Sequence, residues 1–308
     1  MMSEIKVYIG CYKNDFYLLR SCIASIRYWN KTVPVVLLKD FSKGAFDTTE
    51  LERIFDVTVA ITTYKTLGGY MKLQPYIEHP DERIFLQDAD MVWLGDMMEV
   101  LKGIKEDIAI HAYTPDDVAA ELSKWYFEPQ KLKQYYPNYK YPGFVFNGGS
   151  ILLHTKAFNQ NDFDGIIAWQ ERATPLHAGT FLCEDQGIIN YLVADKYLKG
   201  SSRIAKVCLQ VSAESSMAVA YSIADIKKQI QKNIIVHWLG NKTGLTTFYA
   251  SRHLLRFFEK QYYRQIEYGT LKMWAERLLR TTRHMDKFMY GLAKKIYYYL
   301  FIKNGPIK

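Results

Sequence analysis

Short apolar runs of β-type residues alternate with helical patterns through the first half of this 308-residue chain, and no other feature restricts its fold as strongly. Strands that alternate with amphipathic helices at this spacing are typical of βαβ units, in which crossover helices join parallel strands. The clearest helix follows the first strand, with Phe16, Leu19 and Ile23 on one face, and further helices are expected around residues 70–78 and 188–193. The sequence therefore predicts an α/β fold with a mainly parallel sheet flanked by helices. The expected strands are residues 5–10, 34–40, 57–63, 83–87, 108–113, 144–155 and 234–240.

Two segments depart from this alternation. Residues 114–143 are polar, aromatic and interrupted by prolines, so we interpret them as an irregular excursion from the sheet. Residues 251–308 are basic and aromatic with a helical pattern. We therefore expect a catalytic-type body over residues 1–250 and a C-terminal helical tail over residues 251–308.

The net charge of +8 is concentrated in the tail. Residues 251–308 hold 13 Lys and Arg against 4 Asp and Glu, and the preceding residues hold 27 against 28. A neutral body argues against an enzyme that binds nucleic acid in a basic groove, and a basic tail favours contact with an anionic surface.

The cysteines and the hydropathy of the chain indicate the cellular compartment in which the protein is expected. The four cysteines have no metal-ligand spacing, which favours free thiols in a reducing environment. The first residues lead directly into a strand without a signal-peptide pattern, and no apolar run approaches the roughly 20 residues of a membrane-spanning helix. We expect a cytoplasmic protein, or one that is peripheral on the cytoplasmic face of a membrane.

A pair of carboxylates directly follows an expected strand. Asp88 and Asp90 are two residues apart, so in extended chain their side chains point the same way. Open α/β sheets bind ligands at the carboxyl ends of their strands, and paired carboxylates there suit a divalent ion that bridges to a diphosphate. About one such D-x-D pair is expected by chance in a chain of this length, and residues 162–164 supply a second that is typical of helix capping. A solvated turn is therefore the alternative interpretation of Asp88 and Asp90.

Other polar residues can be assigned to a site or to ordinary structure. Lys72 precedes Asp88 by sixteen residues and is either a phosphate ligand or a surface lysine. Asn147 stands before two glycines, where a sugar-binding amide and a β-bulge are both reasonable. Asp185 and Gln186 begin an apolar helix, where a carboxylate also serves as a cap, and His237 ends an apolar strand, where a satisfied core histidine is common.

Taken together, these segments resemble a known family. The order LQDAD, FNGGSILL, EDQGIINYL and HWLG is similar to glycosyltransferase family 8, whose members are retaining enzymes with the GT-A fold. The resemblance extends from about residue 7 to residue 242. It implies a GT-A-like fold, a divalent metal (Mn²⁺ or Mg²⁺) and a nucleotide-sugar donor, expected to be a UDP-hexose.

The resemblance also implies roles for matching residues. The metal would be held by Asp88, Asp90 and His237, a mixed carboxylate and imidazole set that suits Mn²⁺ better than Mg²⁺. Tyr12, Asn14, Lys72, Asp88 and Lys242 would bind the nucleotide and its diphosphate, and Asn147, Asp185 and Gln186 would hold and activate the sugar. One departure from the family concerns Lys242, which follows His237 by five residues rather than six and lacks the usual Pro-Trp after it.

Two further expectations concern where the acceptor binds and what the C-terminal tail contacts. The excursion is the candidate acceptor wall, with aromatic side chains at Trp125, Tyr126, Tyr135 and Tyr136 to stack on sugars. The tail has a basic amphipathic pattern, which predicts either contact with an anionic membrane or a helix docked on the body. A membrane-facing tail favours a lipid-linked or lipopolysaccharide-type acceptor over a soluble one, within the expected class of glycan or lipid-linked acceptors.

The expected reaction is transfer of a hexose from a nucleotide sugar to a glycan or lipid-linked acceptor with retention of configuration, through double displacement at Asp185 or front-face attack. One alternative is a non-catalytic module that binds sugar nucleotides or membranes and descends from such an enzyme. A sugar nucleotidyltransferase is a weaker alternative, because residues 9–20 lack the repeated glycines of its phosphate loop.

Overall fold

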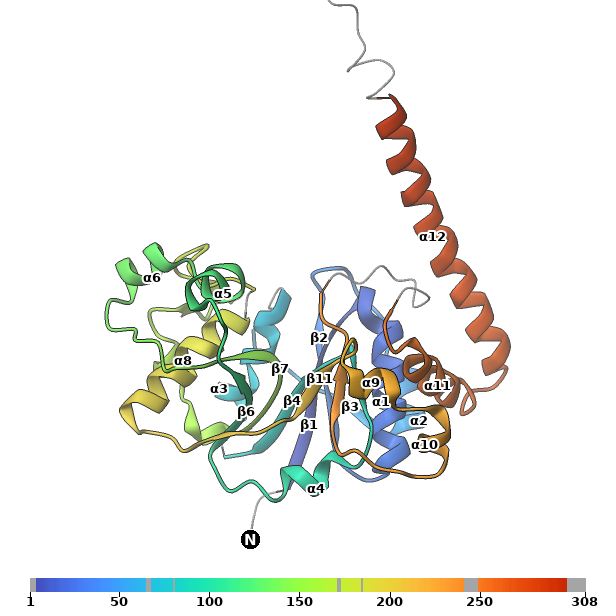
Figure 1. Ribbon diagram of the computed structural model, residues 1–308, viewed down its shortest axis with the longest axis horizontal. Coiled ribbons are helices and arrows are strands. Elements are labelled where there is room, and N and C mark those ends of the chain that lie inside the picture. The colour runs from blue at the N-terminus through green and yellow to red at the C-terminus, as the bar shows by residue number, and fades with distance from the viewer. Residues whose placement is uncertain are drawn as a thin grey trace, which may run out of the picture.

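The computed structural model describes residues 4–64, 68–79, 81–170, 173–183, 185–240 and 249–297, without the side chains of 283–291, 293, 294, 296 and 297. Over these residues a seven-stranded sheet lies between helices, and a long C-terminal helix projects from the body (Figure 1). The strands of this sheet are β1 (Ile5–Tyr12), β2 (Val35–Asp40), β3 (Val57–Val59), β4 (Arg83–Asp88), β6 (Ile108–Tyr113), β7 (Val145–His154) and β10 (Ile204–Lys206).

The central sheet is mainly parallel, as the sequence predicts. Its order is β10-β6-β7-β4-β1-β2-β3, and only β7 runs antiparallel to its neighbours, β4 and β6. Strand β1 lies between β4 and β2, so that Gly10 is beside Asp88 and Tyr12 is beside Asp40. The carboxyl ends of these three strands therefore meet at one edge of the sheet.

A second, three-stranded sheet brings a distant segment to this edge. It consists of β5 (Met91–Trp93), β11 (Gln210–Ser212) and β12 (Ile235–His237), in the order β11-β12-β5. Strand β12 is antiparallel to β5, and His237 pairs with Met91, the residue after Asp90. A two-stranded ribbon, β8 (Ile167–Ala168) and β9 (Thr174–Pro175), lies apart from both sheets.

Helices cover both faces of the central sheet (Figure 1). The α-helices are α1 (Phe16–Trp29), α2 (Thr49–Phe55), α3 (Pro75–Glu78), α4 (Met97–Leu101), α5 (Val118–Trp125), α6 (Pro129–Tyr135), α7 (Gln160–Phe163), α8 (Asp185–Lys199), α9 (Ser216–Ala220), α10 (Ile223–Lys227), α11 (Arg252–Tyr263) and α12 (Gly269–Tyr297). The 3₁₀ helices in the part of the chain that the structure describes are η1 (Lys13–Asp15), η2 (Gly68–Leu73) and η3 (Thr155–Ala157). No helix of the described chain is long and apolar enough to cross a membrane.

Several local expectations differ from the structure. The helix expected at 70–78 is divided into η2 and α3, because Pro75 lacks the N–H that a continuous helix would need and instead occupies the first turn of α3. The strand expected at 57–63 ends at Val59. The excursion 114–143 is not wholly irregular. It contains α5, whose N-cap Asp117 accepts a hydrogen bond from Ala120 N, and α6, which begins at Pro129.

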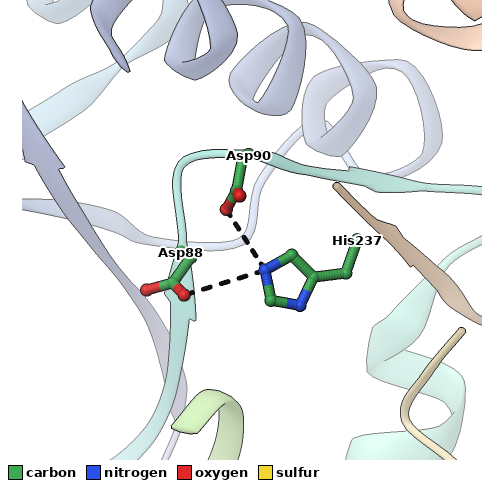
Figure 2. A group of neighbouring side chains, drawn as sticks. All are labelled: Asp88, Asp90 and His237. Carbon is green, nitrogen blue, oxygen red and sulfur yellow. Dashed lines mark ion pairs between the residues drawn. The ribbon is translucent and has the colours of Figure 1, made fainter. Parts of the chain in front are cut away.

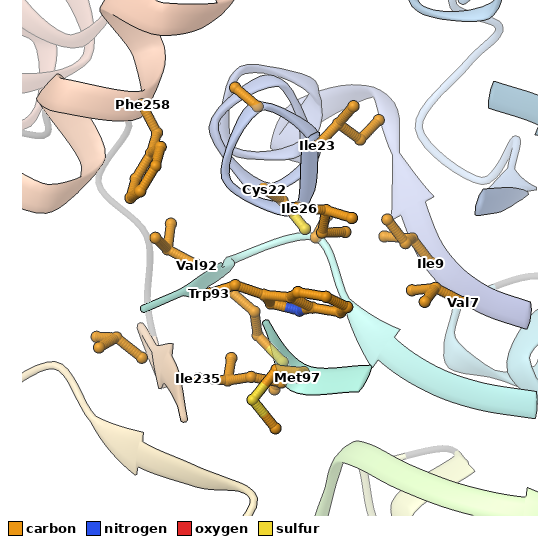
Figure 3. Packing of buried hydrophobic residues seen from close by; sticks show 14 of the residues in the cluster. Val7, Ile9, Cys22, Ile23, Ile26, Val92, Trp93, Met97, Ile235 and Phe258 are labelled. Atoms are coloured by element: carbon orange, nitrogen blue, oxygen red, sulfur yellow. The ribbon is translucent and has the colours of Figure 1, made fainter. Parts of the chain in front are cut away.

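The core on the α1 face is built around one indole ring. Trp93 is fully buried among side chains of β1, α1, α4 and β12 (Figure 3). Its Nε1 donates to Gln87 Oε1 at 2.8 Å, and Gln87 is itself fully buried. Because Gln87 is fixed inside the core, Asp88, the next residue of the strand, faces the opposite side at the sheet edge.

The same core includes helix α11, which packs on α1 with Leu254, Leu255, Phe258 and Tyr262. The division at residue 250 stays a prediction, and the apolar core does not stop there. None of the four cysteines forms a disulfide, as expected, and Cys11 and Cys22 are buried.

Candidate active site

Asp88, Asp90 and His237 converge at the edge of the sheet (Figure 2). Nε2 of His237 lies 3.4 Å from Asp90 Oδ1 and 3.8 Å from Asp88 Oδ2. One ligand atom from each residue can be chosen so that all three lie within 4.8 Å of one another. His237 and Asp90 are buried, and Asp88 is half-buried.

Local packing fixes the orientation of the imidazole. The pairing of β12 with β5 places His237 beside Asp90, and Trp238 N donates to Asp90 O at 3.1 Å. A Cβ atom on Gly149 would lie 2.5 Å from His237 Cε1, so only glycine leaves room for the ring. Nδ1 of His237 is buried and has no hydrogen-bond partner among the described residues, whereas Nε2 faces the two carboxylates.

The donor set fits a divalent metal. Two carboxylates and one imidazole nitrogen are ligands that Mn²⁺ accepts readily, and Mg²⁺ prefers the oxygen ligands alone. The three groups lie close together and largely out of water, where two carboxylates without a cation repel each other. The arrangement agrees with the ligand set that the sequence predicts.

Lys72 forms a buried ion-pair network beside this cluster. Its Nζ lies 2.8 Å from Asp88 Oδ1, 2.8 Å from Asp185 Oδ2 and 3.4 Å from Gly148 O. Burial alone would lower the pKa of Lys72, but the charges and hydrogen bonds of Asp185 and Asp88 outweigh it and hold the pKa above its ordinary value. The lysine is therefore charged. A Cβ on Gly10 would lie 2.9 Å from Lys72 Cγ, so this glycine gives the lysine stem its path.

Amide side chains form a second network next to the carboxylates. Asn147 Nδ2 donates to Gln186 Oε1 at 3.1 Å, and Gly148 N donates to the same oxygen at 3.2 Å. Asn147 Oδ1 accepts from Gly149 N at 2.8 Å and from Gln210 Nε2 at 3.2 Å. The structure thus joins Asn147 and Gln186 next to Asp185, and the role of these three residues in holding a sugar stays a prediction.

A cavity of about 640 Å³ opens between the ends of β1, β2 and β4 and residues of η2. Among the described residues, five aspartates and two lysines line it, so a pyrophosphate there needs a cation beyond these two lysines. The lining residues are Gly10, Tyr12, Asp15, Asp40, Ser42, Lys43, Gly68, Gly69, Met71, Lys72, Asp88, Ala89, Asp90 and Asp185.

Two predicted donor contacts, Asn14 and Lys242, have no role assigned by the structure. Asn14 is exposed and does not line the cavity. Lys242 lies outside the described residues. Both assignments stay predictions.

Sequence reasoning missed two polar residues near the site, Asp40 and Gln210. Asp40 is the last residue of β2, as Asp88 is of β4, and its Oδ1 accepts a hydrogen bond from Ser42 N at 2.6 Å. A carboxylate at the end of an apolar run was the sequence signal that could have identified Asp40. Gln210 has no comparable sequence signal, because only the second sheet brings it to Asn147.

The second D-x-D pair lies elsewhere. Asp162 and Asn159 form a capping box at the start of α7, so the capping interpretation is confirmed. Asp162 also pairs with Lys196 at 2.6 Å.

The candidate acceptor wall holds fewer available rings than expected. Tyr126, the residue that follows α5, is 1% exposed, packs against Phe127 and is hydrogen-bonded to Tyr113, so it cannot stack on a ligand. Trp125 and Tyr135 are exposed, and Tyr135 stacks on His177 with ring centroids 3.8 Å apart. Tyr136 is half-buried and donates to Gly165 O at 2.7 Å.

Comparison with known proteins identifies the fold. No protein-family model matches this chain, and no curated protein matches its sequence. Among solved structures, the apo form of the bifunctional glycosyltransferase WbbM aligns with a TM-score of 0.54 at 16% identity, covering 90% of this chain and 52% of that one. This chain therefore spans about half the length of the WbbM structure.

Two other glycosyltransferases align at lower scores. The apo form of GlyE from Streptococcus pneumoniae TIGR4 has a TM-score of 0.48 at 13% identity, covering 89% of this chain and 64% of that one. An active-site mutant of LgtC has a TM-score of 0.49 at 11% identity, covering 83% and 94%. The fold comparison rests on WbbM, and the chain has the GT-A-like α/β fold that the sequence predicts.

Proposed function

We propose that this protein is a metal-dependent glycosyltransferase that moves a hexose from a UDP-linked donor to a glycan or lipid-linked acceptor with retention of configuration. The observation that carries the proposal is the convergence of Asp88, Asp90 and His237 at the carboxyl edge of the sheet, beside a charged Lys72. The family 8 resemblance and the glycosyltransferase fold support it.

In this proposal the chain's own residues divide the work. Tyr12 and Asn14 contact the nucleoside, and Lys72 and Lys242 contact the diphosphate. A Mn²⁺ or Mg²⁺ ion held by Asp88, Asp90 and His237 would supply Lewis-acid stabilisation of the departing diphosphate. Positioning of the sugar by fixed amide and carboxylate groups supplies much of the remaining rate.

The amide network defines how the sugar is held. The Gln186 carbonyl oxygen accepts from Asn147 and Gly148, so its amide nitrogen is directed away from them and lies 3.4 Å from Trp125 O. Asp185 is paired with Lys72. A carboxylate held this way serves to accept sugar hydroxyls, which favours front-face attack, and double displacement at Asp185 is the alternative. Covalent trapping with a slow fluorinated donor, read by intact mass, separates the two.

Hydrolysis of UDP-glucose and UDP-galactose tests the proposal. We expect Mn²⁺-dependent release of UDP that EDTA abolishes and that falls by at least about a thousandfold in Asp90→Asn. Asp164→Asn, in the second D-x-D pair and exposed, is the matched control and should be unaffected. Absence of turnover with any nucleotide sugar in wild type would instead favour the non-catalytic module.

We further propose that α12 contacts an anionic membrane surface, which would bring the enzyme to a lipid-linked acceptor. Leu271, Trp274 and Leu278 recur on one helix face and are 71%, 60% and 65% exposed. In sequence, Met285, Met289, Leu292 and Ile296 continue the same spacing, and Leu292 is 42% exposed. A basic helix with an exposed apolar stripe matches the chemistry of an interfacial helix.

Ion pairs hold the opposite face of α12 on the body. Lys272 pairs with Glu50 at 2.6 Å, and Arg280 pairs with Glu259 at 2.9 Å. Cosedimentation with phosphatidylglycerol vesicles tests the contact: binding should fall with salt and in Leu278→Glu, and should be weak to phosphatidylcholine. Full-length protein that stays in the supernatant at low salt would contradict it.

A further inference from the structure

A second cavity, of about 310 Å³, lies at the opposite end of β4 from Asp88. It is formed at the amino ends of β1, β2 and β4 and by α4, near the N-terminus in Figure 1. Its volume is at the lower limit for ligand sites in proteins. None of its lining residues belongs to the donor cavity.

A buried guanidinium lines this cavity with part of its hydrogen-bonding capacity unused. Arg83, the first residue of β4, is 6% exposed. Its Nη2 donates to Ile104 O at 2.7 Å and Glu106 O at 3.4 Å, but Nε is buried and meets no acceptor in the described chain. Burial lowers the pKa of Arg83, and Asp107 and Glu106 counteract this only in part.

Another buried arginine shows how this chain satisfies a purely structural guanidinium. Arg27 is 8% exposed and donates from Nε to Phe55 O, from Nη1 to Val33 O and from Nη2 to Asp56 O, at 2.7 to 2.8 Å. The fully buried Nε cannot reach a ligand in the cavity, and Nε of the structural Arg20 is unpaired in the same way. Arg83 differs from Arg27 at Nη1, which makes no hydrogen bond in the described chain and so remains a donor for a ligand.

We propose that this cavity binds a small oxyanion, a phosphate or carboxylate group carried on a compact apolar body. Arg83 supplies a buried cation, and Lys102 supplies a second positive charge on the same wall. Glu4 is the opposing charge on the lining, which leaves a net charge of about +1 and suits a singly or doubly charged ligand rather than a polyphosphate. Val33 and Met98 provide the apolar wall.

The test uses the full chain with two probes, inorganic phosphate and butyrate, at constant ionic strength. Hydrogen exchange reads the site locally: a bound anion should slow exchange in residues 30–34 and 98–104, at millimolar concentrations. This local readout separates binding here from binding of phosphate at the donor cavity. Protection by one probe alone identifies the oxyanion chemistry.

Two variants assign the effect to the cavity. Lys102→Gln should raise the dissociation constant about fivefold, and Arg83→Gln should raise it more than about tenfold. Lys105→Gln, an exposed lysine three residues away and outside the lining, is the matched control and should bind as wild type does. If Arg83→Gln fails to fold, the affinity of Lys102→Gln still decides whether the anion binds in this cavity. No protection by either probe, or equal binding by Lys102→Gln, would overturn the proposal.

Discussion

Gly149 and His237 are matched in space: a Cβ at position 149 would overlap Cε1 of the imidazole at 2.5 Å. The glycine approaches His237 from β7, whereas the histidine is carried by β12. Gly149 is therefore part of the proposed metal site, although it offers no ligand atom.

Gly149→Ala should displace the imidazole and weaken Mn²⁺ binding by tenfold or more, on the order of what loss of a supporting contact costs a metal site. Calorimetric titration with Mn²⁺ measures the change. Gly148→Ala is the neighbouring control, because a Cβ there would meet Asp185 Oδ2 at an ordinary 3.5 Å. Equal affinities for the two variants would show that His237 does not need the space.

Lys72→Met removes the buried cation that Asp88 and Asp185 share. Breaking a buried pair from one side should destabilise the fold by about 3 kcal/mol. Mn²⁺ should then raise the melting temperature of the variant more than that of wild type, because Asp88 no longer divides its charge between lysine and metal. Thermal unfolding with and without Mn²⁺ checks both statements, and an identical Mn²⁺ effect in the two proteins would refute the second.

Gln210→Leu tests whether Gln210 holds the side chain of Asn147 in position. Loss of its hydrogen bond to Asn147 Oδ1 should lower kcat on the order of tenfold, because the sugar-binding amide loses its fixed orientation. UDP affinity should stay unchanged, since Gln210 does not line the donor cavity. A parallel loss of UDP affinity would indicate general disruption of the site instead.

Stability at acid pH should depend on Glu50. Burial would raise its pKa, but hydrogen bonds from Lys272 and Tyr262 and the charge of Lys272 lower it below the ordinary value of 4.5. A carboxylate whose pKa is lower in the folded protein than in the unfolded chain stabilises the fold. This stabilisation is fully present when the pH is above the pKa of the unfolded chain, and it is lost as the pH falls through the pKa of the folded protein. The free energy of unfolding should therefore fall as pH drops below 4.5, and Glu50→Gln should flatten that fall.

Urea denaturation of wild type and Glu50→Gln across this pH range measures the difference. Glu214→Gln, which replaces an exposed carboxylate, serves as the control. Curves for wild type and Glu50→Gln that stay parallel below pH 4.5 would show that the Glu50 contacts add no stability.

The sequence was sufficient for features that depend on neighbours along the chain. The apolar runs of β1, β2, β4, β6 and β7 appear as strands, because alternation and burial are written in consecutive residues. Asp88 and Asp185 could be placed at a strand end and a helix start for the same reason. Short helices such as α5 and α6 could not, because a few residues with a cap carry too weak a pattern.

What the chain alone determined was the order of strands and helices and the chemical groups at their ends. Only tertiary structure decided that Gln210 supports Asn147, that Gly149 makes room for a ring, and that Tyr126 is closed to ligands. Each depends on the pairing of β11 with β12 and of β12 with β5, or on the packing of distant segments. Such contacts arise from long-range burial, which local residue patterns do not encode.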